Sequence, residues 1–251
     1  TAGRPSNRRG GGGGGGGAGG RGAAGRPRGP AAARRPTGGR GRPGRGWQSM
    51  PGAPLTFSLS MPVERADWSG LSLAVGLALA EALDPVQEAA APRVGLKWPN
   101  DLWLLDAPHA GRKLGGVLIE TVAAGAKRLA VIGVGLNVQP MQAPEVGTGF
   151  ACLQEIDAQV EAPAVLHRLA LPLVQAIRRF EAEGFAGFVA AYSRRDLLLG
   201  QPVRTTQQGV AEGVAEGVDE RGALQVRTPA GLVAVTSGEV SVRLGADGGA
   251  G

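Results

Sequence analysis

The pattern of apolar and polar residues after residue 50 predicts a domain that mixes strands and helices. Leu55, Phe57, Leu59 and Met61 fall on one face of an alternating segment at 53–63, which predicts a strand. Residues 67–83, DWSGLSLAVGLALAEAL, have helical spacing and are apolar nearly all round, which predicts a buried helix.

The middle of the chain continues this mixture. Residues 93–105, RVGLKWPNDLWLL, predict a strand, a turn at Trp-Pro-Asn and a second strand. KLGGVLIETV and RLAVIGVGLNV are apolar and β-branched, as interior strands are. A helix is predicted over 165–183, where apolar residues recur every three or four positions. We therefore expect an α+β main domain.

The pattern changes again after about residue 203. Short alternating segments are broken by glycines, which favours hairpins, although the near-repeat GVAEGVAEGV also fits low complexity. We expect a small β-barrel here, appended to the main domain. The domain boundaries we predict are 1–36, 37–197 and 198–245.

Charge separates the N-terminal segment from the rest of the chain. The whole sequence is +6, but residues 1–46 hold 11 of the 27 basic residues, none of the 21 acidic ones and 19 of the 44 glycines. Such a segment buries too little apolar surface to offset its ordering entropy, so we expect residues 1–36 to be disordered. The remainder is mildly acidic, which argues against a nucleic-acid-binding body.

Cysteine content and hydropathy favour a cytoplasmic protein without a membrane span. The single cysteine, Cys152, excludes an internal disulfide and is expected to be a small core residue. The longest apolar run, at 71–83, is shorter than the roughly 20 residues that a membrane helix needs.

Four clusters could carry chemistry. GRGRPGRGW, at 39–47, combines glycines with Arg40, Arg42 and Arg45, whose forked donors suit carboxylate or phosphate. KWPND, at 97–101, is either a polar turn or a site where Lys97 meets phosphate and Asp101 meets Mg²⁺.

The other two clusters lie in predicted strands. GRKLGGVLIE, at 111–120, places Lys113 beside two glycines, which usually means that something packs against the backbone. VIGVGLNV, at 131–138, holds Asn137 as its one polar side chain, and a buried asparagine needs partners, either a ligand or a backbone turn.

Taken together and in this order, these motifs and the terminal GEVSVR closely resemble the biotin protein ligases, from Thr37 to about Leu244. The resemblance implies a class II synthetase-like mixed sheet with helices and an SH3-like C-terminal barrel. It also implies an ATP-dependent, AMP-forming enzyme that makes biotinyl-5′-AMP and transfers biotin to a lysine of a biotin carboxyl carrier domain.

The resemblance assigns roles to individual positions. Arg42 and Lys113 match catalytic cations of the family. Biotin and adenylate binding is implied for Gly39, Arg40, Gly41, Arg42, Arg45, Trp47, Lys113, Gly115, Gly116, Gly133 and Gly135. ATP binding is implied for Lys97, Asn100, Asp101 and Asn137, with Asp101 as the candidate Mg²⁺ ligand.

The sequence departs from the family before the Gly-Arg loop. Family members carry a strand, a Ser-Thr-Asn turn, a helix and then a glutamine that bind the ureido ring, whereas this chain has Ser6-Asn7 and, about where the glutamine belongs, Pro36. We hypothesise that residues 1–36 are a wrong-frame or mis-annotated reading of a GC-rich gene. We therefore expect the chain as written to be weakly active or inactive.

Three alternatives to an active biotin ligase remain. They are a damaged ligase without the Ser-Thr-Asn half of its site, a lipoate-type ligase of the same fold and, least favoured, an Arg/Gly nucleic-acid binder. No helix-turn-helix segment is evident, so specific DNA binding is not expected. A homodimer formed through the sheet is plausible for this family.

Overall fold

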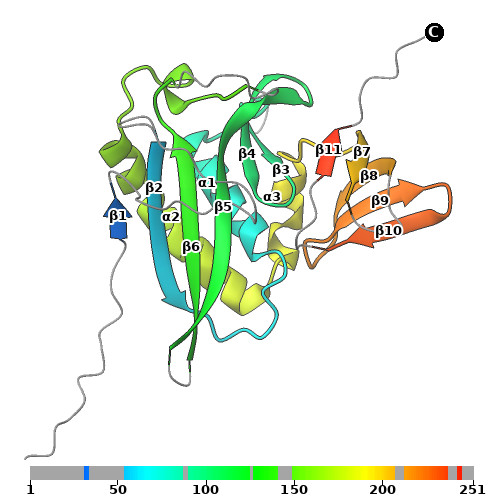
Figure 1. Cartoon of the computed structure of the whole chain (residues 1–251), viewed down its shortest axis with the longest axis horizontal. Helices are drawn as coiled ribbons and strands as arrows, with labels where there is room; N and C mark the ends of the chain where they lie inside the picture. The colour runs from blue at the N-terminus through cyan, green and yellow to red at the C-terminus, as the bar shows by residue number, and fades with distance from the viewer. Residues whose placement is uncertain are drawn as a thin grey trace, which may run out of the picture.

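The computed structural model describes most of the chain downstream of the Gly-Arg loop. The described residues are 31–33, 54–86, 90–124, 127–140, 149–206, 212–236 and 242–244. They form two antiparallel sheets, a six-stranded sheet with helices packed on it and a five-stranded sheet beside it (Figure 1).

The larger sheet has the strand order β1-β2-β6-β5-β4-β3. Its strands are β1 (Ala31–Ala33), β2 (Pro54–Pro62), β3 (Val94–Lys97), β4 (Asp101–Ala107), β5 (Ala110–Ala124) and β6 (Lys127–Asn137). The long β5–β6 hairpin forms its centre, and neighbouring strands of this sheet pair antiparallel.

The helices cover one face of this sheet (Figure 1). They are α1 (Leu71–Leu83), α2 (Ala162–Glu183) and α3 (Val189–Ser193), with short 3₁₀ turns η1 (Leu153–Glu155) and η2 (Ala186–Phe188). Helix α1 buries residues on all sides, as predicted, because it lies between the sheet and α2. Helix α2 buries a single stripe, namely Val165, Leu169, Leu173, Ala176, Ile177 and Phe180.

The smaller sheet follows α3 and has the order β10-β9-β8-β7-β11. Its strands are β7 (Pro202–Thr205), β8 (Glu212–Val218), β9 (Leu224–Thr228), β10 (Gly231–Val235) and β11 (Val242–Leu244). Leu224, Val226 and Val235 lie in its buried interior. Within the part of the chain that the structure describes, β10 does not pair with β11, so the predicted barrel closure is not confirmed.

The sequence predictions for the main domain hold, with changes at element ends. The predicted helix at 67–83 begins only at Leu71, because Gly70 has a left-handed backbone, with φ of 82°. The predicted helix at 165–183 begins earlier, at Ala162. Of the segment 1–36, for which we expect disorder, Ala31–Ala33 form the short strand β1, which pairs with β2 through Ala33 and Thr56 among others. The other residues of that segment lie outside the described residues.

A buried ion pair fastens the segment after α3 to the larger sheet. Arg195 Nη1 lies 3.0 Å from Asp84 Oδ2, at the end of α1, and also donates to the carbonyl of Val94 on β3. The Asp84 carboxylate accepts further hydrogen bonds from the backbone amides of Arg93 and Val94. The described helices include none that is long and apolar enough to cross a membrane.

Candidate active site

The strand register aligns the sequence clusters in one row across the larger sheet. Lys97 on β3 pairs with Asp101 on β4, Asp101 with Gly116 on β5, and Gly116 with Gly135 on β6. Gly135 in turn pairs with Thr56 on β2. We call these five residues the central row. Residues paired across antiparallel strands point to the same face, so motifs far apart in sequence meet here.

The central row lies on the face of the sheet away from the helices. On β2 and β6 the alternate residues, including Leu55, Phe57, Val134 and Leu136, are buried in the core that the helices cover. The intervening positions therefore face the opposite side. The two glycines at the middle of the row leave this face without side chains between Asp101 and Thr56, so a ligand can approach the backbone.

A β-bulge brings Lys113 to the same face. Lys113 pairs with Trp103, but Gly115 pairs with the adjacent Leu102, so Leu114 is an extra residue in β5. In a regular strand Lys113 and Gly116, three residues apart, would point to opposite faces, because side chains alternate along a strand. The bulge takes up the extra residue, so that both point to the same face. The bulge lets the Lys113 Nζ reach Asp101 Oδ1 at 2.7 Å, with both side chains about a quarter to a third exposed.

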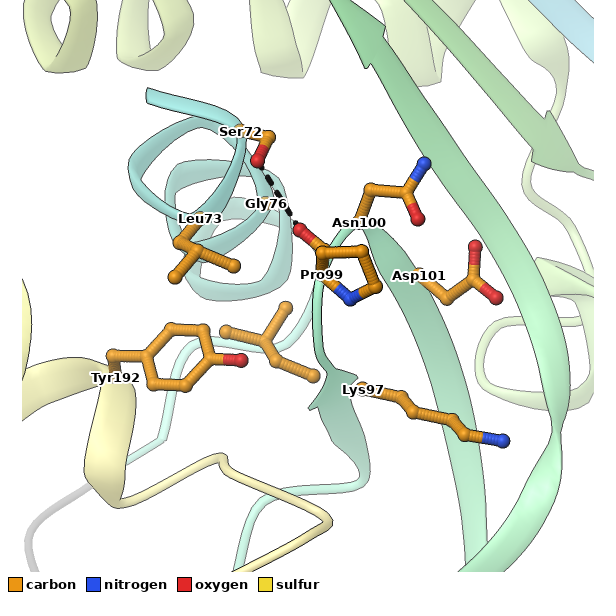
Figure 2. A pocket seen from close by; sticks show the side chains of 9 residues that line it. Ser72, Leu73, Gly76, Lys97, Pro99, Asn100, Asp101 and Tyr192 are labelled. Carbon is orange, nitrogen blue, oxygen red and sulfur yellow. Dashed lines mark hydrogen bonds between the residues drawn. The ribbon is translucent and has the colours of Figure 1, made fainter. Parts of the chain in front are cut away.

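The KWPND motif forms the turn between β3 and β4. The Trp98–Pro99 peptide bond is cis. The Ser72 hydroxyl of α1 donates to the Pro99 carbonyl at 3.1 Å, and Figure 2 shows Lys97 and Asp101 extending away from that helix. Asn100 is bound twice to β5, because its side-chain amide donates to the Val117 carbonyl and its own carbonyl accepts from the Val117 amide.

The space beneath this turn is too small for a substrate. Ser72, Leu73, Pro99 and Tyr192 are among the residues that line a cavity of about 10 Å³, room for at most one water molecule (Figure 2). The turn is therefore packed closely against α1. Lys97, Asn100 and Asp101 also line this cavity, but the side chains of Lys97 and Asp101 extend away from the helix (Figure 2). The Lys97 Nζ lies 4.4 Å from the centre of the Trp103 ring.

Asn137 finds its partners in the backbone, which is one of the two alternatives left open by the sequence. Its buried side-chain amide donates to the carbonyls of Lys113 at 3.3 Å and Ala151 at 3.0 Å. The Ala151 amide also donates to the Lys113 carbonyl at 2.9 Å. Asn137 thus joins three segments around the backbone of Lys113.

Arg112, next to Lys113, clamps the segment at 150–155 onto β5. Its guanidinium binds Asp106 at 2.8 Å and Glu155 at 2.7 Å, and also donates to the Phe150 carbonyl. The hydrogen bonds from Arg112 lower the pKa of both carboxyl groups and raise the pKa of the guanidinium.

A second cavity opens beside this clamp. It has a volume of about 230 Å³ and is lined by Arg112, Pro140, Phe150, Ala151, Cys152 and Glu155. Burial raises the pKa of the Cys152 thiol, which agrees with the expected core role for this residue rather than a nucleophilic one.

The glycines assigned to the ligand differ in their surroundings. A Cβ on Gly115 would lie 2.3 Å from the Gly135 carbonyl oxygen, so this glycine is required by strand packing. A Cβ on Gly116 would lie 3.1 Å from Asp101 Oδ1, directly beside the ion pair. At Gly133 the nearest atom would be 3.4 Å away, which is ordinary contact.

Comparison with known proteins identifies this arrangement. Sequence profiles match at residues 24–137 for the Biotin/lipoate A/B protein ligase family and at 198–243 for the Biotin protein ligase C terminal domain. The biotin--[acetyl-CoA-carboxylase] ligase of Mycobacterium tuberculosis is 34% identical over 215 residues, which cover 81% of this chain and 75% of that protein. The chain belongs to the biotin protein ligase family.

Relatives of this ligase family also include longer proteins and solved structures. The Bifunctional ligase/repressor BirA of Escherichia coli is 34% identical over 212 residues. This match covers 82% of the present chain but only 63% of the length of BirA. The Aquifex aeolicus biotin protein ligase in complex with biotin and ATP superimposes with a TM-score of 0.72 at 30% identity, covering 86% of this chain and 89% of that one. The first profile match begins at residue 24, before Thr37, where the quoted motifs begin.

The structure describes part of the site that the sequence predicted for a biotin ligase. It brings together Lys97, Asn100, Asp101, Lys113, Gly115, Gly116, Gly135 and Asn137, with Gly133 on the same face two residues along β6. The predicted loop residues lie outside the described residues, namely Gly39, Arg40, Gly41, Arg42, Arg45 and Trp47.

Several residues that shape this site had no role predicted from the sequence. Trp98 and Arg112 stood inside quoted motifs without a role, and an aromatic residue in a polar turn was a signal that it packs against another element. Thr56 belongs to the central row, and its hydroxyl is buried with no hydrogen-bond partner among the described residues.

Proposed function

We propose that the chain is an ATP-dependent biotin protein ligase that forms biotinyl-5′-AMP and then transfers biotin to a lysine of a biotin carboxyl carrier domain. The observation that carries this proposal is the meeting of Lys113, Asp101 and the glycines of the central row on one face of the sheet. A fold shared with a ligase in complex with biotin and ATP supports it.

The proposed first step joins two anionic substrates. A biotin carboxylate oxygen attacks the α-phosphorus of ATP, the new C–O–P bond forms, and the bond to pyrophosphate breaks. Cations must offset the repulsion and the charge on the phosphoryl oxygens. Lys113 supplies one such cation beside the backbone of Gly116, and Arg42 of the Gly-Arg loop is proposed to supply another.

In the proposed reaction Lys113 and Asp101 exchange their mutual ion pair for contacts with the substrates and a metal ion. At 2.7 Å the carboxylate holds the ammonium beside Gly116. When substrates bind, the ammonium can transfer to the biotin carboxylate and the α-phosphate, which leaves Asp101 for a metal ion. Lys97 and Asn100 of the same turn then lie beside the triphosphate.

Asp101 fits Mg²⁺ as it is bound with a nucleotide. Magnesium keeps several waters and uses one or two carboxylates together with substrate phosphates, so a single carboxylate is a suitable protein ligand. The ion would neutralise charge on the leaving pyrophosphate.

The second step consumes the mixed anhydride. The acceptor lysine amine attacks the acyl carbon, an amide bond forms, and AMP leaves. Because the anhydride hydrolyses readily, the proposed Gly-Arg loop residues Arg40, Arg45 and Trp47 would close over it and exclude water. We also propose that the C-terminal sheet closes as an SH3-like barrel, that the protein works in the cytoplasm, and that it can form a homodimer.

The test is biotin transfer by the full chain. The protein is incubated with ATP, Mg²⁺, labelled biotin and a carrier domain, and turnover is expected to be low because the sequence has no Ser-Thr-Asn turn before the loop. Lys113→Ala should lower the rate by about 100-fold or more, since it removes a cation from the transition state. Lys127→Ala, at the far end of the β5–β6 hairpin, is the matched control. Lack of transfer by the unmodified chain would contradict the proposal and favour the damaged ligase.

A further inference from the structure

Trp98 connects the candidate site to the smaller sheet. Its side chain is 1% exposed and lies between Lys97 and Pro99, inside the turn that carries Asn100 and Asp101. Its indole N–H does not bond within the larger sheet but donates to the Gly222 carbonyl at 3.0 Å. Gly222 belongs to the β8–β9 connection of the C-terminal sheet.

That connection holds the Gly222 carbonyl in a fixed place. Asp219 Oδ1 accepts hydrogen bonds of 2.9 Å from the backbone amides of Arg221 and Ala223, and the Gly222 amide donates to the Asp219 carbonyl. Gly222 has a left-handed backbone, with φ of 78°. A Cβ at Gly222 would lie 2.7 Å from the Gly70 Cα, so the connection packs closely against the start of α1.

Other residues of the turn at 97–101 form hydrogen bonds with the larger domain. Ser72, in the first turn of α1, binds the Pro99 carbonyl, and Val117 on β5 binds both polar groups of Asn100. The next residue is Asp101, whose carboxylate pairs with Lys113. A continuous set of hydrogen bonds and covalent bonds therefore runs from the β8–β9 connection to the ion pair.

We propose that Trp98 is a positioning residue through which the C-terminal sheet sets the position of the Asn100–Asp101 turn for the nucleotide. The inference rests on the proposed function and assigns a role in that reaction to a residue that does not touch substrate. Loss of the indole donor leaves a buried carbonyl unsatisfied and frees one of three attachments of the turn. Asn100 and Asp101 are the residues proposed for ATP, whereas Gly133 and Gly135, proposed for biotin, lie on β6, which β5 separates from the turn. The larger effect is therefore expected on ATP.

The test is Trp98→Phe in the full chain, with Trp68→Phe as the matched control. Trp68 also donates its indole N–H to a backbone carbonyl, at Arg65, but that carbonyl is three residues away in the same loop. Biotin-dependent ATP–pyrophosphate exchange should show the KM for ATP raised about tenfold in Trp98→Phe, as expected for one buried hydrogen bond, and the KM for biotin changed less than twofold. Asp219→Ala, which loosens the connection without altering the core, should also raise the KM for ATP.

Amide hydrogen exchange at Val117 gives a readout that needs no turnover. Its amide is bonded to Asn100, so exchange should be about tenfold faster in Trp98→Phe and unchanged in Trp68→Phe. Unchanged exchange, or equal changes of both KM values, would overturn the inference. A wild-type chain that makes no biotinyl-5′-AMP would instead contradict the proposed function, and the exchange rates would still decide the coupling.

Discussion

At the scale of the residue, two neighbouring glycines that look equivalent in the sequence have different surroundings in the fold. Gly115 and Gly116 are neighbours in one motif, yet the first faces the backbone of β6 and the second faces the Lys113–Asp101 pair. The β-bulge at Leu114 has a similar effect, because it decides which face receives Lys113.

Alanine at these two glycines should therefore give different results. Gly115→Ala should lower the free energy of unfolding by about 2 kcal/mol or more, because a Cβ 2.3 Å from a carbonyl oxygen forces β5 and β6 apart. Gly116→Ala should retain most of that stability and lose adenylation activity, since its Cβ crowds Asp101. Urea unfolding and pyrophosphate exchange measure the two effects, with Gly133→Ala as the stability control. Equal destabilisation at both positions would disprove the distinction.

At the scale of the element, a buried ion pair holds the segment after α3 against the sheet. Arg195 satisfies Asp84 and two carbonyls, and both charged side chains are largely removed from water. Such pairs contribute little net stability compared with apolar packing, but removing one partner leaves an uncompensated charge.

Arg195→Met should consequently lower the free energy of unfolding by about 3 kcal/mol. Arg204→Met offers the contrast, because Arg204 pairs with Glu212 on the surface of the smaller sheet, where both side chains are about two-thirds exposed. That substitution should cost less than about 1 kcal/mol. Chemical denaturation measures both, and a surface pair as costly to break as the buried one would refute this account.

At the scale of the whole molecule, the junction between the two sheets contains a buried carboxyl group. Asp196 is 7% exposed and accepts a hydrogen bond from the Leu198 amide, while its second oxygen has no partner among the described residues. Burial raises its pKa from 3.8 to about 6, against the opposing effects of the backbone hydrogen bonds and His109. Burial also raises the pKa of the Tyr192 phenol, and the charge of Asp196 adds to this effect.

The stability that Asp196 contributes should therefore decrease as the pH rises. Because its folded pKa lies above the unfolded value of 3.8, folding favours the protonated group, and this contribution is complete below that value and lost as the pH passes about 6. The Asp196→Asn side chain does not titrate. Between pH 4 and pH 7 the free energy of unfolding of this variant, relative to that of the wild type, should therefore increase by up to about 3 kcal/mol. Denaturant unfolding of both proteins across this range measures it, and parallel pH profiles would contradict the assignment.

The sequence by itself determined the elements and the motifs, because periodicity records which side of a strand or helix is buried. The strands at 93–105 and 111–138, the buried helix α1 and the resemblance to biotin ligases all follow from local pattern and order. The sequence did not predict the strand at Ala31–Ala33, because three alanines carry no strand pattern and their pairing with β2 is a contact between distant residues.

Only the tertiary structure decided how the motifs meet. Strand register placed Lys97, Asp101, Gly116 and Gly135 in one row, and register depends on pairings between segments that a linear pattern does not specify. The bulge that aims Lys113 and the partner that Trp98 finds 124 residues away are likewise properties of the packed chain. The local sequence thus shows which reactive residue types are present, whereas long-range packing places them on one face of the sheet and holds them there.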